Sequence, residues 1–272
     1  MHLDRFVLSL VCIAAVSSPA DAATVAYIGP TGTNAQDVSN TGTLNAAFGS
    51  GGWTQLTYTV ADVAVASTYD VMYVERGTST QASFVTFLNT NRLALETFVN
   101  NGGRLFLNTG YSTLNGSAGF GPSNHSPINL IFGASADRSN GADGTTGTAV
   151  VGAPPALFVG AGTTWAAGSA DFAPDYIVSN ADTPLILDNN LRPVLTVQRV
   201  YNNGPNGDSG FVFFGGLAPQ SLLTPSAQAG QLRANILSYV ASLPEPGEWL
   251  LLGLGGCALI FALHRRRKLL VA

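Results

Sequence analysis

The first half of the chain opens with short apolar runs that are typical of buried strands. Residues 24–28 form a β-branched run that stops at Gly29-Pro30, and residues 69–74 form a second such run. Residues 56–60 alternate between apolar and polar side chains only weakly. The pattern therefore predicts two buried strands, with a weaker element between them.

An amphipathic segment and another strand follow. Apolar residues recur at helical spacing from residue 80 to about residue 100, with Ser79 or Thr80 as the N-cap. Residues 101–103, Asn-Gly-Gly, predict a C-cap in the left-handed backbone conformation. Residues 104–108 form a strand directly afterwards. A strand, a helix and a strand joined by short turns make a βαβ unit, which implies a parallel sheet.

The second half of the chain has a weakly periodic middle and a regular end. Residues 110–174 are rich in Gly, Ala, Ser and Thr. We expect long loops over the sheet here, with small strands. Strands are predicted at residues 184–188, 194–201 and 211–215, and the last two form a hairpin because an Asn/Gly-rich turn separates them. A final amphipathic helix covers residues 226–242. The prediction is an α/β protein with a mostly parallel sheet and a C-terminal antiparallel hairpin, in one domain spanning residues 24–243.

Two stretches of this domain resemble a known superfamily. Residues 95–107, Leu-Glu-Thr-Phe-Val-Asn-Asn-Gly-Gly-Arg-Leu-Phe-Leu, look like the helix-then-strand signature of the class I glutamine amidotransferase-like and ThuA-like proteins. Residues 213–216 and 233–237 are similar to the closing strand and helix of that superfamily. The resemblance implies a flavodoxin-like three-layer fold, and fold does not settle function.

The N-terminus reads as a Sec signal peptide over residues 1–23. His2 and Arg5 precede an apolar stretch at residues 6–16, and Ala20-Asp21-Ala22 is a cleavage site of the A-x-A type. The alternative is an N-terminal anchor, but an apolar run this short does not span about 30 Å of hydrocarbon. The mature chain is therefore expected to begin near residue 23 or 24.

The C-terminus, residues 244–272, has three parts in a fixed order. Pro244-Glu245-Pro246 is followed by an apolar run at about residues 249–263 and then by the basic cluster Arg265, Arg266, Arg267 and Lys268. The prolines end the preceding helix, the apolar run predicts one transmembrane helix, and the basic cluster keeps the C-terminus in the cytoplasm. The domain would then lie outside the inner membrane.

This order resembles the PEP-CTERM sorting tail. The resemblance implies processing near Pro244, Glu245 and Pro246 by an exosortase, a membrane cysteine transpeptidase-like enzyme, in bacteria that make exopolysaccharide and biofilm. Gly247-Glu248 departs from the family, in which a small apolar residue usually follows the motif. The alternative is a plain C-terminal anchor that stays uncleaved.

Composition excludes several classes of function. Residues 24–243 contain seven arginines, no lysine and twelve acidic residues, which gives a net charge of −5 and no basic stripe for nucleic acid. Cys12 lies in the leader and Cys257 in the tail, so the domain has no cysteine nucleophile and no thiolate metal site.

The turn after the strand at residues 104–108 is where the amidotransferase resemblance would place a reactive group. Residues 108–112, Asn-Thr-Gly-Tyr-Ser, contain neither Cys nor His. As a nucleophile, Ser112 needs a base to take its proton, and the domain has one histidine, His125. Ser112, His125 and Asp143 are a conceivable catalytic set. We expect no catalytic residue in the domain, and keep Asn108, Ser112 and His125 as the candidates for a degenerate active site.

Other candidate sites have an ordinary structural alternative. Residues 29–34 are either a phosphate-cradling turn or a plain Gly/Thr-rich turn, and residues 137–144 and 202–208 are either Ca²⁺ loops or polar turns. Four aromatic residues either face carbohydrate or fill the core: Trp53, Tyr111, Trp165 and Tyr176. In each case the structural alternative is preferred, and no cofactor or metal is expected.

The sequence thus predicts an exported, non-catalytic protein of the cell surface or extracellular matrix. Its expected partners are the Sec translocon, signal peptidase, an exosortase-like enzyme, the inner membrane through the tail, and exopolysaccharide. The alternative is a hydrolase or amidotransferase-like enzyme with a degenerate site.

Overall fold

The computed structural model describes residues 23–29, 35–76, 81–110, 127–138, 146–167, 175–180, 182–201, 209–218, 223–224 and 226–243. The predicted signal peptide, apart from its last residue, and the whole predicted sorting tail lie outside these ranges. Among the described residues, none of the helices combines the length and the apolar character needed to cross a bilayer.

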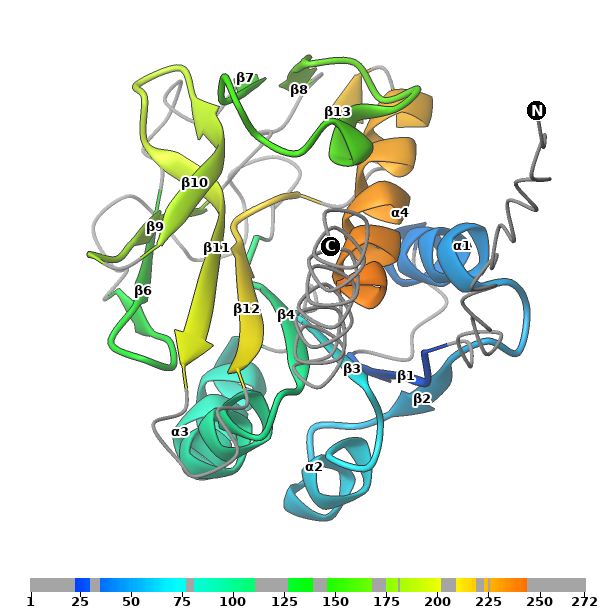
Figure 1. Cartoon of the computed structure of the whole chain (residues 1–272), viewed down its shortest axis with the longest axis vertical. Coiled ribbons are helices and arrows are strands. Elements are labelled where there is room, and N and C mark those ends of the chain that lie inside the picture. Colours follow the sequence, from blue (N-terminus) through cyan, green and yellow to red (C-terminus); the bar gives the residue numbers. More distant parts are fainter. Residues whose placement is uncertain are drawn as a thin grey trace, which may run out of the picture.

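Five parallel strands form one half of a ten-stranded sheet (Figure 1). They are β1 (Val25–Ile28), β2 (Thr54–Leu56), β3 (Val71–Glu75), β4 (Arg104–Asn108) and β12 (Ser209–Gly215). Their spatial order is β2-β1-β3-β4-β12, and every neighbouring pair in it is parallel. This is the strand order 2-1-3-4-5 of flavodoxin-like folds.

The other half of the sheet is antiparallel. It continues from β12 through β11 (Pro193–Tyr201), β10 (Thr183–Asp188), β7 (Thr146–Ala149), β8 (Thr164–Ala167) and β13 (Leu223–Thr224). A separate antiparallel sheet contains β5 (Ile128–Asn129), β6 (Ser135–Arg138) and β9 (Asp175–Val178). A 3-10 helix, η2 (Pro155–Phe158), lies between β7 and β8. The antiparallel part is therefore larger than the single predicted hairpin of β11 and β12.

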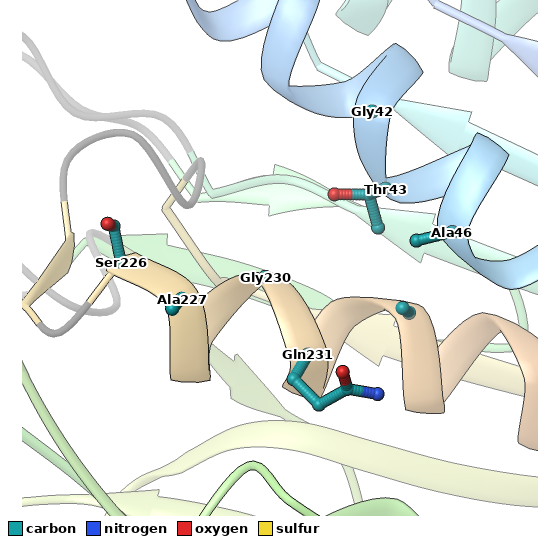
Figure 2. Close-up of a pocket in the computed structure, with 8 residues that line it drawn as sticks. Gly42, Thr43, Ala46, Ser226, Ala227, Gly230 and Gln231 are labelled. Atoms are coloured by element: carbon teal, nitrogen blue, oxygen red, sulfur yellow. The ribbon is translucent and has the colours of Figure 1, made fainter.

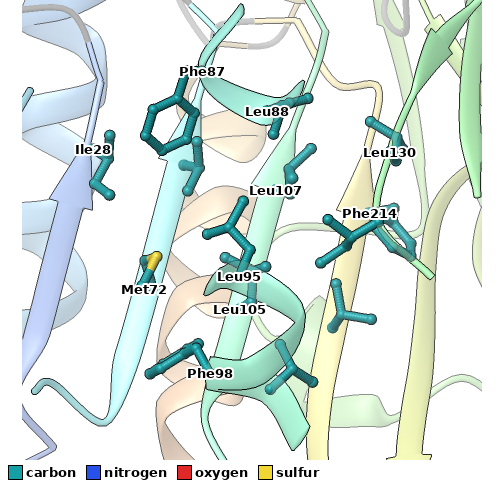
Figure 3. Close-up of a cluster of buried hydrophobic side chains, with 14 of the residues drawn as sticks. Ile28, Met72, Phe87, Leu88, Leu95, Phe98, Leu105, Leu107, Leu130 and Phe214 are labelled. Carbon is teal, nitrogen blue, oxygen red and sulfur yellow. The ribbon is translucent and has the colours of Figure 1, made fainter. Parts of the chain in front are cut away.

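Helices cover both faces of the parallel half, so the domain has three layers. They are α1 (Ala35–Phe48), α2 (Val60–Ala66), α3 (Gln81–Asn100) and α4 (Ser226–Ser242). On one face, Leu44 of α1 and Ile236 of α4 pack over Phe213 of β12. On the other face, Leu95 of α3 packs over Leu105 and neighbouring apolar side chains of the strands (Figure 3). Successive strand residues alternate between these two cores, as the pleat requires.

Most predicted elements are confirmed, and two helices were not predicted. The strand at residues 104–108 and the helix at 226–242 have the expected bounds, and β1, β3, α3 and the β11–β12 hairpin are present. Residues 56–60 are not one element, because β2 ends at Leu56 and α2 begins at Val60. Thr59 caps α2, accepting a hydrogen bond from the backbone N–H of Asp62 at 3.1 Å. The sequence prediction contained neither α1 nor α2.

Candidate functional site

The carboxyl ends of the parallel strands meet a cluster of buried polar side chains. In open α/β sheets this edge is where ligands bind. Here β3 ends at Glu75 and β4 ends at Asn108, and both side chains are fully buried. Arg233 of α4, also buried, approaches them from the helix layer. These two strand ends and α4 supply the three central side chains of the site.

Glu75 and Arg233 form an ion pair inside the domain. The Nη2 of Arg233 lies 3.3 Å from Oε1 of Glu75, and its Nη1 donates to the hydroxyl of Tyr73 at 3.1 Å. The same Nη1 donates to Oδ1 of Asn40 of α1 at 2.9 Å. The hydroxyl of Tyr73 donates in turn to Oε2 of Glu75. One guanidinium thus ties α4, α1 and β3 together.

Asn108 joins this pair to the loop after β12. Its Nδ2 donates to both carboxylate oxygens of Glu75, at 3.1 and 3.0 Å, and to the carbonyl of Leu217 at 2.9 Å. Its Oδ1 accepts from the backbone N–H of Leu217 at 3.0 Å. The Nη2 of Arg233 also donates to the carbonyl of Leu217, at 2.8 Å. The side chain of Asn108 is therefore fully engaged by internal partners.

Burial controls the ionisation of this cluster. Burial raises the pKa of Glu75 above its ordinary value, although Arg233, Tyr73 and Asn108 all act to lower it. Burial also raises the pKa of Tyr73 well above that of a free tyrosine. For Arg233, burial opposes the charged form, but Glu75 and Tyr73 outweigh it and the pKa rises. Tyr73 therefore stays a neutral donor, and Arg233 stays a cation.

A second buried ion pair links the two sheets at the same edge. Arg76 follows Glu75, and its Nη1 lies 3.4 Å from Oδ2 of Asp175, the first residue of β9. The same nitrogen donates to the carbonyl of Thr109 at 3.2 Å. The turn after β4 is thus held from the side of the small sheet as well as from α4.

Backbone fills the space around this turn. A Cβ on Gly110 would lie 2.3 Å from the carbonyl carbon of Gly216, and a Cβ on Gly216 would lie 1.9 Å from the carbonyl oxygen of Asp175. Three chain segments therefore meet here in backbone-to-backbone contact. This arrangement leaves no room beside Gly110 or Gly216 for even a methyl group.

Replacing Gly216 by alanine should therefore lower the free energy of unfolding by about 1–3 kcal/mol, because the added methyl group clashes with backbone atoms that cannot move aside as a side chain could. The matched control is Gly42→Ala in α1, where a Cβ would meet nothing within 4 Å. That change should instead stabilise the protein by about 0.5–1 kcal/mol, since glycine is a poor helix former. Denaturant unfolding of both variants measures the difference, and a neutral Gly216→Ala would contradict the packing described for this edge.

The structure describes only part of the predicted site. Asn108 lies in the buried cluster, whereas Ser112, His125 and Asp143 lie outside the described residues. Asp137, from the predicted Ca²⁺ loop, accepts a hydrogen bond from the hydroxyl of Tyr176 at 3.0 Å. Within the described ranges, no group of three or more His, Cys, Asp or Glu side chains is placed to hold a metal ion.

The aromatic residues considered for carbohydrate binding are largely internal. Trp165 is buried, and its Nε1 donates to the carbonyl of Ala161 at 2.8 Å, which confirms the prediction that it fills the core. Trp53 packs edge-on against Tyr27 at a ring distance of 5.9 Å and is half-buried. Tyr176 is half-buried beneath the guanidinium of Arg192. Tyr111, like residues 30–34 and 202–208, lies outside the described residues.

A groove of about 420 Å³ lies between α1 and α4 (Figure 2). Small residues form most of its walls, and Thr43, Ser226 and Gln231 supply its polar side chains. None of the described residues that line it is titratable. The groove therefore offers shape and a few hydrogen-bonding groups, but no acid–base chemistry from these residues.

Comparison with known proteins supports the fold alone. No protein family matches the sequence, and no curated protein matches it. Among solved structures, the chain is similar to a Thermoplasma acidophilum protein assigned to GMP synthase as one of its subunits, with a TM-score of 0.51 and 10% sequence identity. The match covers 81% of this chain and 95% of that one. At the level of fold, it agrees with the amidotransferase-like resemblance of the domain.

Proposed function

We propose that the chain is an exported protein of the cell surface or extracellular matrix, in which an amidotransferase-like fold serves a structural or binding role. The observation that supports a non-catalytic role is that the buried polar groups described at the carboxyl edge bond to one another. The carboxylate of Glu75, the amide of Asn108 and both terminal nitrogens of Arg233 bond to one another and to internal partners, which are Tyr73, Asn40 and the backbone of Leu217. Bonding of this kind within the protein supports a structural role for these side chains.

The proposed localisation rests on the predicted signal peptide and the C-terminal tail. Export by the Sec translocon and removal of residues 1–23 by signal peptidase would place the domain outside the inner membrane. The segment at about residues 249–263 would then anchor it, until an exosortase-like enzyme acts near Pro244, Glu245 and Pro246. Exopolysaccharide is the partner that this destination favours, and the groove between α1 and α4 is of suitable size, with uncharged walls and a few hydrogen-bonding side chains.

The similarity to a GMP synthase protein keeps an enzymatic role as the second candidate. It requires Ser112 and His125 to meet beside the turn that begins at Asn108. Ser112→Ala distinguishes the two: in an enzyme it abolishes hydrolysis of an activated ester or amide by the purified domain. In a structural or binding protein, the wild-type domain shows no such turnover above background.

The sorting proposal predicts the mass of the mature protein. In the native host, the wild-type chain should end near residues 244–246, with or without an attached group. A Pro244→Ala/Glu245→Ala variant should retain residues 247–272, because the processing motif is gone. Intact-mass measurement of the membrane, surface and medium fractions checks both. The control is Ser242→Ala, an exposed position at the end of α4 that leaves the motif intact. A processed double variant, or a wild-type chain that keeps its tail, would overturn the sorting proposal.

A further inference from the structure

The last turn of α4 is fixed to the sheet by one arginine. Arg104, the first residue of β4, is buried, and its Nη1 donates to the carbonyls of Ala241 at 2.5 Å and Leu243 at 2.9 Å. Its Nε donates to the carbonyl of Asp70, beside β3, at 3.4 Å. The point from which the C-terminal tail leaves the domain is therefore set at the amino end of β4.

A row of aromatic and basic side chains begins at this point and runs across the sheet. Arg104 pairs with Phe211 of β12, and Phe211 pairs with Arg199 of β11, so the three side chains share one face. The guanidinium of Arg199 lies 5.5 Å from the ring centre of Phe211 and 4.9 Å from that of Tyr201. Tyr201 is 66% exposed, whereas Phe211 is half-buried.

The segment that follows Leu243 has the chemistry to match this row. Residues 244–249 read Pro-Glu-Pro-Gly-Glu-Trp, which combines proline rings, two acids and a tryptophan. Proline-rich segments dock on aromatic surfaces in an extended conformation, and carboxylates pair with guanidinium groups that stack on aromatic rings. The length also fits, since β4 and β11 are two strand spacings apart, about 10 Å. Three extended residues span about 10 Å.

We propose that Arg199, Tyr201 and Phe211 form a docking surface for residues 244–249 of the same chain. Glu245 pairs with Arg199, and the prolines that flank it lie against the rings of Tyr201 and Phe211. The tail then leaves the domain along a defined path, and the Pro-Glu-Pro segment is presented on a folded surface. This inference is independent of the sorting proposal, because it concerns the chain while its tail is attached, whether or not the tail is later removed.

Spin-label distances in the full chain test the docking. The domain has no cysteine, so Cys257→Ser allows labels to be placed at Gly247→Cys in the tail and Thr183→Cys on β10, an exposed position beside Val197 of β11. We expect a narrow distance distribution in detergent-solubilised, leader-processed chain. Arg199→Glu and Tyr201→Ala should each abolish the narrow peak. Arg199→Glu combined with Glu245→Arg should restore it, because the charge pair is then reversed but intact.

The control is Leu93→Ala, which removes an exposed apolar side chain from α3 on the opposite face and should leave the peak unchanged. A broad distribution in the parent chain would overturn the docking. So would a narrow peak that survives Arg199→Glu and Tyr201→Ala. A peak that disappears on dilution would also overturn it, because the surface would then bind a second copy of the chain.

Discussion

Replacing Arg233 by methionine should lower the free energy of unfolding by about 3–5 kcal/mol, because the change leaves the carboxylate of Glu75 buried without its counter-charge. Arg233 is 3% exposed, and Glu75 is fully buried. The carbonyl of Leu217 and the amide oxygen of Asn40 would each lose a donor as well. Chemical denaturation monitored by tryptophan fluorescence measures the loss.

A double variant separates the ion pair from simple loss of packing. In Arg233→Met/Glu75→Gln neither charge remains, and the glutamine amide oxygen can still accept from Nδ2 of Asn108. The double variant should therefore be more stable than Arg233→Met alone, although less stable than the wild type. The loss in the double variant is compared with the sum of the losses in Arg233→Met and Glu75→Gln alone. If the two are equal, the side chains contribute independently to stability, contrary to the 3.3 Å contact between them.

The sign of the pH dependence follows from the raised pKa of Glu75. A carboxyl with a higher pKa in the folded state binds its proton more tightly there, so its contribution to stability is fully present at acid pH and is lost as pH rises through the folded pKa. Without Arg233 that pKa rises further. The deficit of Arg233→Met should thus be largest at neutral and alkaline pH and should shrink as pH falls toward the ordinary carboxyl range.

The elements that could be predicted from the sequence are those in which apolar residues recur at the spacing of a strand or a helix within the element itself. The strand at residues 104–108 has three successive apolar residues at positions 105–107 and follows a glycine pair, and α4 repeats its apolar side chains at helical spacing. By contrast, the buried face of α1 contains Ser39, Asn40 and Thr43. Its partners lie far along the chain, since Asn40 meets Arg233 across 193 residues. No local pattern could therefore indicate that this helix forms.

The buried cluster left a weak signal in the sequence. Glu75 ends an apolar strand, and Arg233 lies within the apolar face of α4, beside Leu232 and one turn before Leu237. In a domain with so few charges, two opposite charges at core positions indicate that they meet. Of the residues proposed for a degenerate active site, only Asn108 is described, and no local pattern indicated its bond to Glu75. The roles of Ser112 and His125 stay predictions.

The parallel half of the sheet and the closed cluster depend on each other. Arg233 reaches Glu75 only because α4 packs against β12 and β4 through apolar side chains on the same face as Tyr73. The cluster in turn fixes the loop after β12 through Leu217. Loss of apolar packing under α4 should therefore weaken the polar site without changing any of its residues.

Phe213→Ala should produce that effect, with a loss of about 3–5 kcal/mol in the free energy of unfolding. Phe213 is fully buried in β12 and meets the ring of Tyr239 of α4 edge-on, at a centroid distance of 6.1 Å. Its removal leaves a cavity between strand and helix that neither can close without moving the other. Thermal and denaturant unfolding report the loss, and hydrogen exchange in α4 should rise with it.

Phe211→Ala is the matched control, because Phe211 lies two residues earlier on the same face of the same strand and is only half-buried. It removes the same side chain but creates less of a cavity, so its loss should be clearly smaller and exchange in α4 should change little. Equal losses in the two variants would mean that α4 does not seal this face over Phe213. In that case, apolar packing under α4 would not be what holds Arg233 against Glu75.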